Sequence, residues 1–570
     1  MFAYLRRRLT FLVALLVLAA GLVVFRLVQV QVVQGASLQP RAQQERVHRL
    51  VLPAPAWGVI VDRDGFLLAT NEPRYAVEAN PPYIKDMPFV AERLAPVLGV
   101  PAEAVAAALR GDHSWVSLEP FATTQQGEAV RRLGLDGVDA RLRWVRRYPN
   151  GPLAAHMLGF VSRGGKGFYG LEGYYDRALR PPAPVWEGET GPAGRRPLPQ
   201  EEGSVPPPLA GNDLVLTLDL GVQAVVEEEL AWGLETFGAE SGTVIVMDPR
   251  TGAILAMASQ PGFDPNRYER YVYWGQEELF LAPAIGAQYE PGSVFKIVTV
   301  AAALDSGTIT AQTTYVDTGA IEVGGQVYTN WDGEAYGEQG LVGLLGHSLN
   351  VGAARLAVQM GPDTFYRYVR AFGFGRPTGV DLQGEAAGRV RVPGDLDWHD
   401  SDLGANSFGQ GLAATPLQVV TAIAAVANEG RLMRPYLVAR QVLPDGTVME
   451  SQPVVRGQPI SPQTANALAE VLAQAVEQWV VQARVPGYRI GGKTGTSQIP
   501  IPGGYDPRWT IGSFVGFGPV EEPQLIILVQ LNRPRVSPWG SETAAVVFQR
   551  LAARLFPMLG IPPDGPATVE

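Results

Sequence analysis

Apolar and polar positions change their pattern several times along this chain, and the first pattern is an uncharged run near the start. After Arg6-Arg7-Arg8, residues 9–25 contain no charged side chain, and an apolar pattern resumes behind Arg26. A helix of that length extends roughly 26 Å, which is enough to span a hydrocarbon core. The run therefore predicts a membrane-spanning helix.

The arginines before this run belong on the cytoplasmic side of a membrane. We expect a cytoplasmic tail over residues 1–8, a single transmembrane anchor over residues 9–30, and the bulk of the chain outside the cytoplasmic membrane. The alternative is a cleaved signal peptide. Its apolar region is usually shorter, and no clear A-x-A site follows here.

A mixed α/β pattern covers residues 40–211. Residues 59–61 are apolar and run into Asp62-Arg63-Asp64-Gly65, as a strand entering a turn does. Helical spacing occurs at residues 91–98 and 102–109. Residues 181–211 are dense in Pro, Gly and Glu, so they predict a surface loop or linker and mark a domain boundary.

The second half, residues 212–560, combines strands with longer helices, and residues 561–570 form a tail. The expected elements are a helix over 220–232 capped by Asp219, a hairpin of strands 242–247 and 253–257, strands over 513–517 and 525–531, and a helix over 542–555. Hairpin strands, a helical middle, further strands and a terminal helix indicate an α+β fold with an antiparallel sheet covered by helices.

Composition narrows the class of protein. The chain is 46% hydrophobic and 18% charged, which is typical of globular domains. Its net charge of −10 argues against a nucleic-acid partner. There is no cysteine, and the five histidines lack metal-ligand spacing, so we expect no disulfide, no metal and no cofactor.

Lysine is rare: four lysines stand against 42 arginines. Two of them lie in motifs that require a primary amine. Lys296 follows Ser293 by three residues, and on a helix both side chains share one face. Arginine stays protonated, whereas a buried lysine can lose its proton and activate a serine. The pair predicts a serine nucleophile with a lysine base, and Lys493 is a second cation that could lower the pKa of that base.

Two further motifs follow. Ser348-Leu349-Asn350 is a weak signal alone, because such triplets occur freely. The run Gly491-Gly492-Lys493-Thr494-Gly495-Thr496 is stronger, because glycines on a strand beside a lysine let a substrate backbone approach closely. In this order, the three motifs are the serine-lysine set of β-lactamases and penicillin-binding proteins.

Over nearly its full length the chain resembles a class B penicillin-binding protein, a membrane-anchored D,D-transpeptidase of peptidoglycan synthesis. The resemblance also rests on segments 57–65, 147–149, 156–159, 170–173 and 407–411, which taken singly are turn and packing positions. It implies that residues 40–211 are the pedestal, or dimerisation-type, domain and residues 212–560 the transpeptidase domain. Trp57 stands where the family usually has arginine, and residues 181–211 depart from its usual glycine-bearing hairpin.

Some motifs resemble the division (septal) branch more than the elongation branch. They are Ser348-Leu349-Asn350-Val351-Gly352, Phe372-Gly373-Phe374-Gly375 and Val515-Gly516-Phe517. The elongation branch often has aspartate where Asn350 stands. The resemblance therefore favours a role in division, with the elongation branch as the alternative.

The resemblance implies a role for each motif residue. Ser293 attacks the carbonyl of the penultimate D-Ala of a stem peptide ending in D-Ala-D-Ala, and Lys296 is the general base. Ser348 relays the proton to the departing D-Ala, Lys493 holds the local positive field, and Asn350 binds the substrate amide and helps to position Lys296. Donor binding falls to Thr494, Gly495 and Thr496. The oxyanion is held by the backbone N–H groups of Ser293 and Thr496.

Other activities use the same motifs. A D,D-carboxypeptidase is the nearest alternative, and a β-lactamase would need neither anchor nor pedestal. A non-enzymatic scaffold or sensor that β-lactams acylate is a third. No E-D-x-x-F-x-x-H stretch occurs, so glycan polymerisation should fall to a partner. The resemblance implies a SEDS-type glycosyltransferase in the membrane as that partner, and β-lactams as inhibitors.

Overall fold

The computed structural model describes residues 2–29, 47–51, 56–111, 113–180, 185–189 and 210–564. The chain divides into two compact units. The first combines residues 1–55 with 181–209, and the second combines residues 56–180 with 210–570.

The first unit contains one long helix and one small sheet. Helix α1 (Phe2–Val28) covers most of the predicted anchor. Strands β1 (Val47–Val51) and β8 (Val185–Glu189) pair antiparallel. Strand β8 lies inside the segment predicted as a loop, where Val185 and Trp186 supply side chains that favour strands. Residue 30, residues 190–209 of the predicted linker and residues 565–570 of the predicted tail lie outside the described residues.

Among the residues that the structure describes, no helix combines the length and the apolar character needed to cross a membrane.

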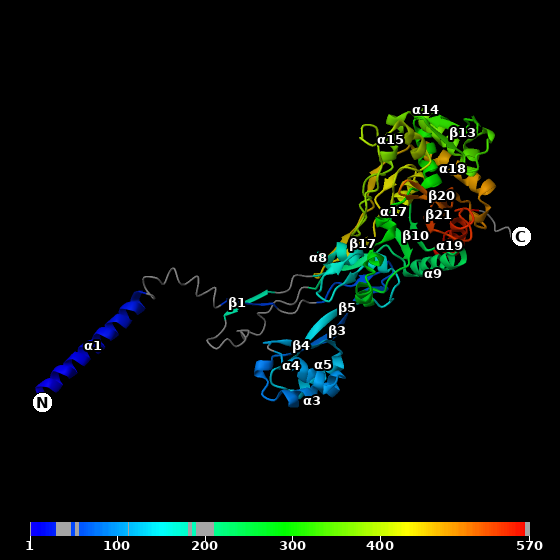
Figure 1. Cartoon of the computed structure of the whole chain (residues 1–570). Helices are drawn as coiled ribbons and strands as arrows, with labels where there is room; N and C mark the ends of the chain where they lie inside the picture. The colour runs from blue at the N-terminus through cyan, green and yellow to red at the C-terminus, as the bar shows by residue number, and fades with distance from the viewer. Residues whose placement is uncertain are drawn as a thin grey trace. The chain divides into compact units, whose positions relative to one another are not determined.

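The second unit is built around a five-stranded antiparallel sheet, of which Figure 1 labels β10, β20 and β21. The strand order is β11-β10-β22-β21-β20. Its strands are β10 (Ser241–Met247), β11 (Ile254–Gln260), β20 (Gly491–Ile501), β21 (Gly504–Gly518) and β22 (Leu525–Asn532). The predicted hairpin is confirmed as β10 and β11. The expected antiparallel sheet is thus present, and β20 is one of its two edges.

Helices bury both faces of this sheet. Helices α9 (Leu220–Phe237) and α19 (Ala544–Met558) pack on one face, and α17 (Pro416–Val426) packs on the other. Along β22, Ile527 and Val529 face the α9–α19 side, whereas Ile526 and Leu528 face the α17 side. Alternate side chains point to opposite faces of a strand, so burial of both faces explains the apolar run of residues 525–529 in β22.

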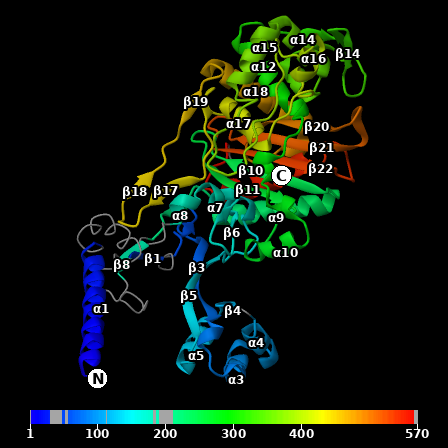
Figure 2. The same ribbon diagram turned by 60° about the vertical axis from the view of Figure 1, so that its left-hand side comes forward.

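A helical region lies beside the β20 end of the sheet (Figure 2). Its helices are α12 (Lys296–Asp305), α13 (Leu341–Gly346), α14 (Asn350–Met360), α15 (Pro362–Ala371), α16 (Asp400–Ser407) and α18 (Pro462–Trp479). Its hairpins pair β12 (Tyr315–Asp317) with β15 (Gly337–Gln339), and β13 (Ala320–Val323) with β14 (Gln326–Thr329). Helix α12 is buried over eight of its ten residues, which makes it the central helix of this region.

A second, seven-stranded sheet joins the two halves of the sequence in the order β18-β17-β9-β2-β3-β4, with β5 also on β3. Its strands are β2 (Ile60–Val61), β3 (Leu67–Ala79), β4 (Val116–Ala122), β5 (Val138–Arg147), β9 (Asp213–Leu216), β17 (Val438–Val442) and β18 (Val448–Glu450). Strand β2 pairs parallel with β9, so the sheet crosses the predicted boundary at residue 211.

A small apolar core of its own lies at the far end of this sheet. There α3 (Met87–Leu98), α4 (Ala102–Leu109) and α5 (Thr124–Leu133) pack on β3, β4 and β5. The two predicted helices of this region are both present. The remaining short elements include α6 (Ala155–Leu158), α7 (Gly170–Tyr174), α8 (Asp176–Leu179), α10 (Tyr268–Tyr273), α11 (Pro283–Gly286), β6 (Phe160–Val161), β7 (Gly167–Phe168), β16 (Leu432–Met433) and β19 (Val455–Gly457).

Three of the motif segments near the start of the second unit meet in one buried ion pair. Arg146 Nε lies 2.6 Å from Glu172 Oε1, and both side chains are 1% exposed. The same arginine donates to the carbonyl oxygen of Gly58 at 2.7 Å, and the Tyr148 hydroxyl donates to Glu172 at 3.3 Å. These contacts join the three segments through one buried network of hydrogen bonds and an ion pair.

We predict that Glu172→Ala lowers the free energy of unfolding by about 3–5 kcal/mol, because it leaves the Arg146 charge buried without a partner. Thermal unfolding of the purified protein, followed by near-ultraviolet circular dichroism, measures the change. The control is Glu269→Ala, which removes the carboxylate of the exposed Arg163 pair and should cost less than about 1 kcal/mol. Equal effects of the two substitutions would contradict the prediction.

Candidate active site

Ser293 and Lys296 lie where a short turn passes into the central helix. Residues Gly292–Phe295 form a 3-10 turn, and Lys296 is the first residue of α12. The sequence predicted that both residues lie on one helix, whereas Ser293 lies in this tighter turn and only Lys296 lies in α12. Lys296 Nζ lies 3.0 Å from Ser293 Oγ, so the predicted contact between the two side chains is present.

Ser348 approaches the same amine from the junction of α13 and α14. Its carbonyl oxygen lies 2.5 Å from Lys296 Nζ, and its Oγ lies 3.2 Å from it. The backbone of Ser348 has a φ of +60°, which lies in the left-handed region that residues other than glycine rarely adopt. This conformation turns both oxygens of one residue toward the amine. Strained backbone of this kind is concentrated at functional sites.

Asn350 opens α14, two residues beyond Ser348. Its amide nitrogen donates to the carbonyl oxygen of Thr329, the last residue of β14, at 2.9 Å. The hydrogen bond fixes the side chain at the surface of the helical region. Its amide oxygen is then the atom that can accept from a ligand N–H.

The third motif lies on the edge strand β20, which packs against the turn that carries Ser293. Lys493 Nζ lies 3.1 Å from the carbonyl oxygen of Thr494 and 3.2 Å from its hydroxyl. The Thr496 hydroxyl accepts from the backbone N–H of Gly540 at 3.1 Å. An edge strand leaves backbone N–H and C=O groups open to an extended ligand.

Gly495 brings this strand close to the turn. A Cβ atom at this position would lie 2.4 Å from Ser513 Oγ and 2.8 Å from Val294 Cγ2. Both distances are shorter than van der Waals contact. The glycine in the motif is therefore required by packing between β20 and the serine turn.

Burial sets the electrostatics of the site. The Lys296 side chain is fully buried, and its pKa lies well below the ordinary lysine value because of burial and, secondly, the nearby Lys493. Burial lowers the pKa of Lys493 to about 7. Ser293, Ser348 and Asn350 are half-buried and so can be reached by a ligand. The site combines two desolvated amines with accessible hydroxyl groups.

Several residues beside the site were not singled out from the sequence. The rings of Trp331 and Trp539 lie 5.1 Å apart, and they belong to segments next to Asn350 and Gly540. Glu290, three residues before Ser293, accepts from the Gly411 N–H at 2.9 Å and from the Tyr505 hydroxyl. No motif marks these positions, because the contacts join segments far apart in the sequence.

Two serine hydroxyls, those of Ser497 on β20 and Ser513 on β21, are buried and have no hydrogen-bond partner among the described residues. Within the described part of the chain, no group of three or more His, Asp or Glu side chains is arranged to bind a metal ion.

The chain is similar to penicillin-binding proteins in both sequence and fold. Residues 242–553 match the domain family described as "Penicillin binding protein transpeptidase domain". Residues 53–216 match the family described as "Penicillin-binding Protein dimerisation domain". Stage V sporulation protein D of Bacillus subtilis is 32% identical over 98% of this chain and 86% of its own length. A protein of Neisseria meningitidis named probable peptidoglycan D,D-transpeptidase PenA is 30% identical, covering 98% of this chain and 93% of its own.

A solved structure supports the same class. Penicillin binding protein 3 of Mycobacterium tuberculosis, complexed with aztreonam, superposes with a TM-score of 0.69 at 27% identity and covers 91% of this chain and 99% of its own. The chain belongs to the class B penicillin-binding proteins and carries their transpeptidase domain.

We predict that Lys493→Met raises the free energy of unfolding by roughly 1–4 kcal/mol near neutral pH, because a buried charge without a carboxylate is replaced by an apolar side chain. The pKa of this lysine is about 7 in the folded protein against 10.5 ordinarily, so the unfolded chain binds the proton more tightly. The destabilisation of the folded protein by this lysine is therefore greatest below about pH 7, and it becomes smaller as the pH rises above that value.

Thermal unfolding at several pH values tests this prediction. The exposed Lys85→Met is the matched control and should change stability little at any pH. A gain from Lys493→Met that is equal at all pH values would contradict the electrostatic explanation.

Proposed function

We propose that this chain is a peptidoglycan D,D-transpeptidase in which Ser293 forms the acyl-enzyme, Lys296 is the general base, and Ser348, Asn350 and Lys493 complete the catalytic set. The observation that carries the proposal is the position of Lys296 Nζ, buried and within 3.2 Å of both serine hydroxyls. The relatives from Neisseria and from Caulobacter vibrioides, the latter 31% identical, are both named probable peptidoglycan D,D-transpeptidases.

The first step is the attack of Ser293 on the carbonyl carbon of the penultimate D-Ala. A neutral lysine amine has two N–H bonds and one lone pair. It can donate to the carbonyl oxygen of Ser348 while its lone pair faces the Ser293 hydroxyl. Proton transfer to the amine then activates the serine. The lowered pKa of Lys296 supplies the neutral form that this step needs.

Collapse of the tetrahedral intermediate breaks the amide bond and releases the terminal D-Ala as an amine. The departing nitrogen needs a proton, and the Ser348 hydroxyl, 3.2 Å from Lys296 Nζ, can relay it. Lys493 in its charged form keeps the site positive and disfavours a second cation at Lys296.

The donor peptide lies extended along β20 in this mechanism. Its carboxylate is bound by Thr494 and Thr496, with Gly495 allowing the close approach. The side-chain oxygen of Asn350 accepts from an amide N–H of the substrate. Backbone N–H groups of Ser293 and Thr496 hold the oxyanion, an interaction whose removal typically slows catalysis by 10²–10³-fold.

The amine of a neighbouring stem peptide then attacks the acyl-enzyme and forms the cross-link. Transfer is favoured over the hydrolysis of a D,D-carboxypeptidase because the relatives are named transpeptidases over almost the whole chain. The name FtsI of the Caulobacter relative and the motifs of the division branch favour a role in division. The complex of the mycobacterial protein with aztreonam supports covalent inhibition by β-lactams.

The rest of the proposal concerns the setting of the enzyme. Residues 9–30 anchor it in the cytoplasmic membrane, residues 40–211 form its pedestal, and residues 212–560 form the transpeptidase domain outside the cell membrane. Its partners are peptidoglycan stem peptides and a SEDS-type glycosyltransferase. This part rests on the uncharged run of residues 9–25 and on the resemblance to the family.

We predict that Ser293→Ala abolishes covalent labelling by fluorescent penicillin, because the acyl group has lost its acceptor oxygen. Lys296→Arg should reduce labelling at least 10³-fold, since a guanidinium stays protonated and cannot act as the base. Gel fluorescence of the purified full-length protein gives both results.

The matched control is the exposed Lys85→Arg, which should label at the normal rate. Near-normal labelling of the Lys296 variant would remove that residue as the base. A labelled band that disappears within seconds in the unmodified protein would indicate hydrolysis instead of transfer.

Acylation should depend on pH with a bell-shaped profile. Its acid limb reflects loss of the proton from Lys296, whose pKa is lowered. Its alkaline limb reflects loss of the charge on Lys493, whose pKa is about 7, so the rate falls as the pH rises beyond that value. Stopped-flow acylation by a chromogenic cephalosporin measures the profile.

Lys493→Arg should move the alkaline limb to higher pH, because arginine keeps its charge there. The test needs only residual activity in that variant. An alkaline limb at the unchanged pH would show that another group is responsible.

A further inference from the structure

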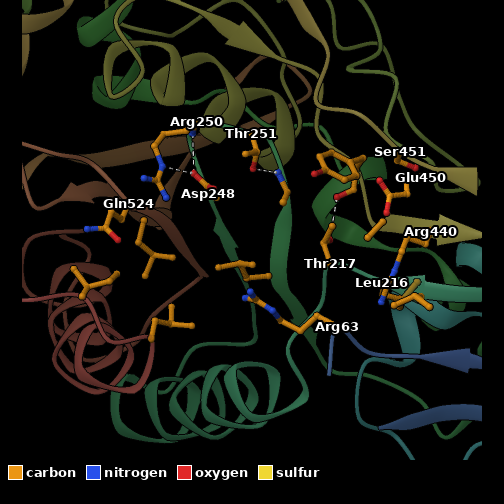
Figure 3. Close-up of a pocket in the computed structure, with 18 residues that line it drawn as sticks. Arg63, Leu216, Thr217, Asp248, Arg250, Thr251, Arg440, Glu450, Ser451 and Gln524 are labelled. Carbon is orange, nitrogen blue, oxygen red and sulfur yellow. Dashed lines mark hydrogen bonds and ion pairs between the residues drawn. The ribbon is translucent and has the colours of Figure 1, made fainter. Parts of the chain in front are cut away.

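A cavity of about 600 Å³ lies at the opposite end of the five-stranded sheet from the catalytic serine (Figure 3). Its walls come from the β2–β3 turn, β9, the β10–β11 turn, the β17–β18 hairpin, the start of β22 and the segment after α19. Strand β11 is the sheet edge opposite β20. The proposed catalytic function therefore makes no use of this cavity.

The wall of the cavity offers apolar as well as polar surface. Its partly exposed apolar side chains are those of Val215, Tyr436 and Leu559, whereas Leu216 and Leu525 are buried. The one buried hydroxyl there, that of Thr217, already donates to the carbonyl oxygen of Ile254 at 2.7 Å. A ligand would thus meet apolar surface at Val215 and Leu559.

The rim is cationic. Arg63, Arg250 and Arg440 come from three different elements, and Figure 3 shows them around the opening. Arg250 is engaged, because its Nε lies 3.3 Å from Asp248. Within the described residues, the exposed side chains of Arg63 and Arg440 have no hydrogen bond or ion pair.

Both arginines line one cavity without an ion pair to any described residue, although the net charge of the chain is −10. Arg440 lies opposite Glu450 in the β17–β18 register without an ion pair between them. Two separated guanidinium groups above an apolar wall suit a ligand with carboxylates at intervals and apolar groups between them.

We propose that this cavity binds an extended peptide segment of a partner protein that alternates acidic and apolar side chains. The segment's carboxylates pair with Arg63 and Arg440, and its apolar side chains contact Val215 and Leu559. Gln524 and Ser451 at the rim can bond to its backbone.

A phosphate or pyrophosphate group fits this rim less well. Such a group concentrates its charge at one point and needs donors that converge there, whereas these arginines come from separate elements. The carboxylates of Asp248 and Glu450, which also line the cavity, would repel a compact polyanion. An extended peptide can place its charges at the arginines and away from these carboxylates.

The test is fluorescence anisotropy of a labelled, amidated heptapeptide of alternating Leu or Val and Glu, titrated with the purified full-length protein. Arg63→Gln combined with Arg440→Gln should weaken binding about tenfold or more and reduce its dependence on salt. The matched control combines Arg131→Gln with Arg132→Gln, which removes two exposed charges at the end of α5 and should leave the affinity unchanged.

The proposal fails if the cavity variant and the control bind the peptide equally, if the same peptide with Gln in place of Glu binds as well, or if inorganic pyrophosphate at equal concentration displaces the peptide completely. Labelling by fluorescent penicillin should stay normal in both double variants, which shows that they are folded. If the cavity variant loses labelling, the second variant is Arg63→Lys combined with Arg440→Lys. This variant keeps both charges, so it should show normal labelling and normal peptide binding. Because labelling and peptide binding are separate readouts, this proposal can fail while the catalytic proposal stands.

Discussion

Two ammonium groups buried side by side are the constraint on which the rest of this site depends. Water would keep both lysines protonated, so an amine that can accept a proton exists only if the fold removes the water. Helix α12 achieves this by lying almost wholly inside the core, and β20 packs against the 3-10 turn that precedes it. The cost is carried by the surrounding apolar packing, which extends over both faces of the five-stranded sheet. Stability and reactivity therefore oppose each other at Lys493.

Close packing around the two lysines also restricts which residues can stand at positions that take no part in the reaction. Gly495 has no room for a side chain because Val294 and Ser513 lie against it. Gly409 is limited in the same way, since a Cβ there would lie 2.2 Å from the carbonyl oxygen of Gly292. The backbone of Ser348 is held in a left-handed conformation that aims two oxygens at one amine. The precision of the site thus comes from the backbone around the lysines as much as from the motif side chains.

Local patterns in the sequence predicted the helices, the first hairpin and the order of the motifs. The spacing of Ser293 and Lys296 was sufficient to predict their contact, because three residues make about one turn in either kind of helix. The 3-10 turn was not predicted, since it depends on packing against β20. Contacts such as Trp331 with Trp539, and the pairing of β2 with β9, join distant segments and leave no periodic signal in the sequence. The class of protein could be recognised only because three weak motifs occur together.

The pairing of β2 with β9 and of β9 with β17 has a consequence for how the chain is made. Ile60 pairs with Leu214, which pairs in turn with Gln441. During synthesis, β2 and β3 emerge about 150 residues before β9, and β9 emerges more than 200 residues before β17, so one edge of the growing sheet stays open while much of the chain is still being translated. Native order in this sheet cannot be completed until β17 arrives. A chain interrupted before that strand would expose an unpaired edge, which is a ready template for aggregation and a target for proteolysis.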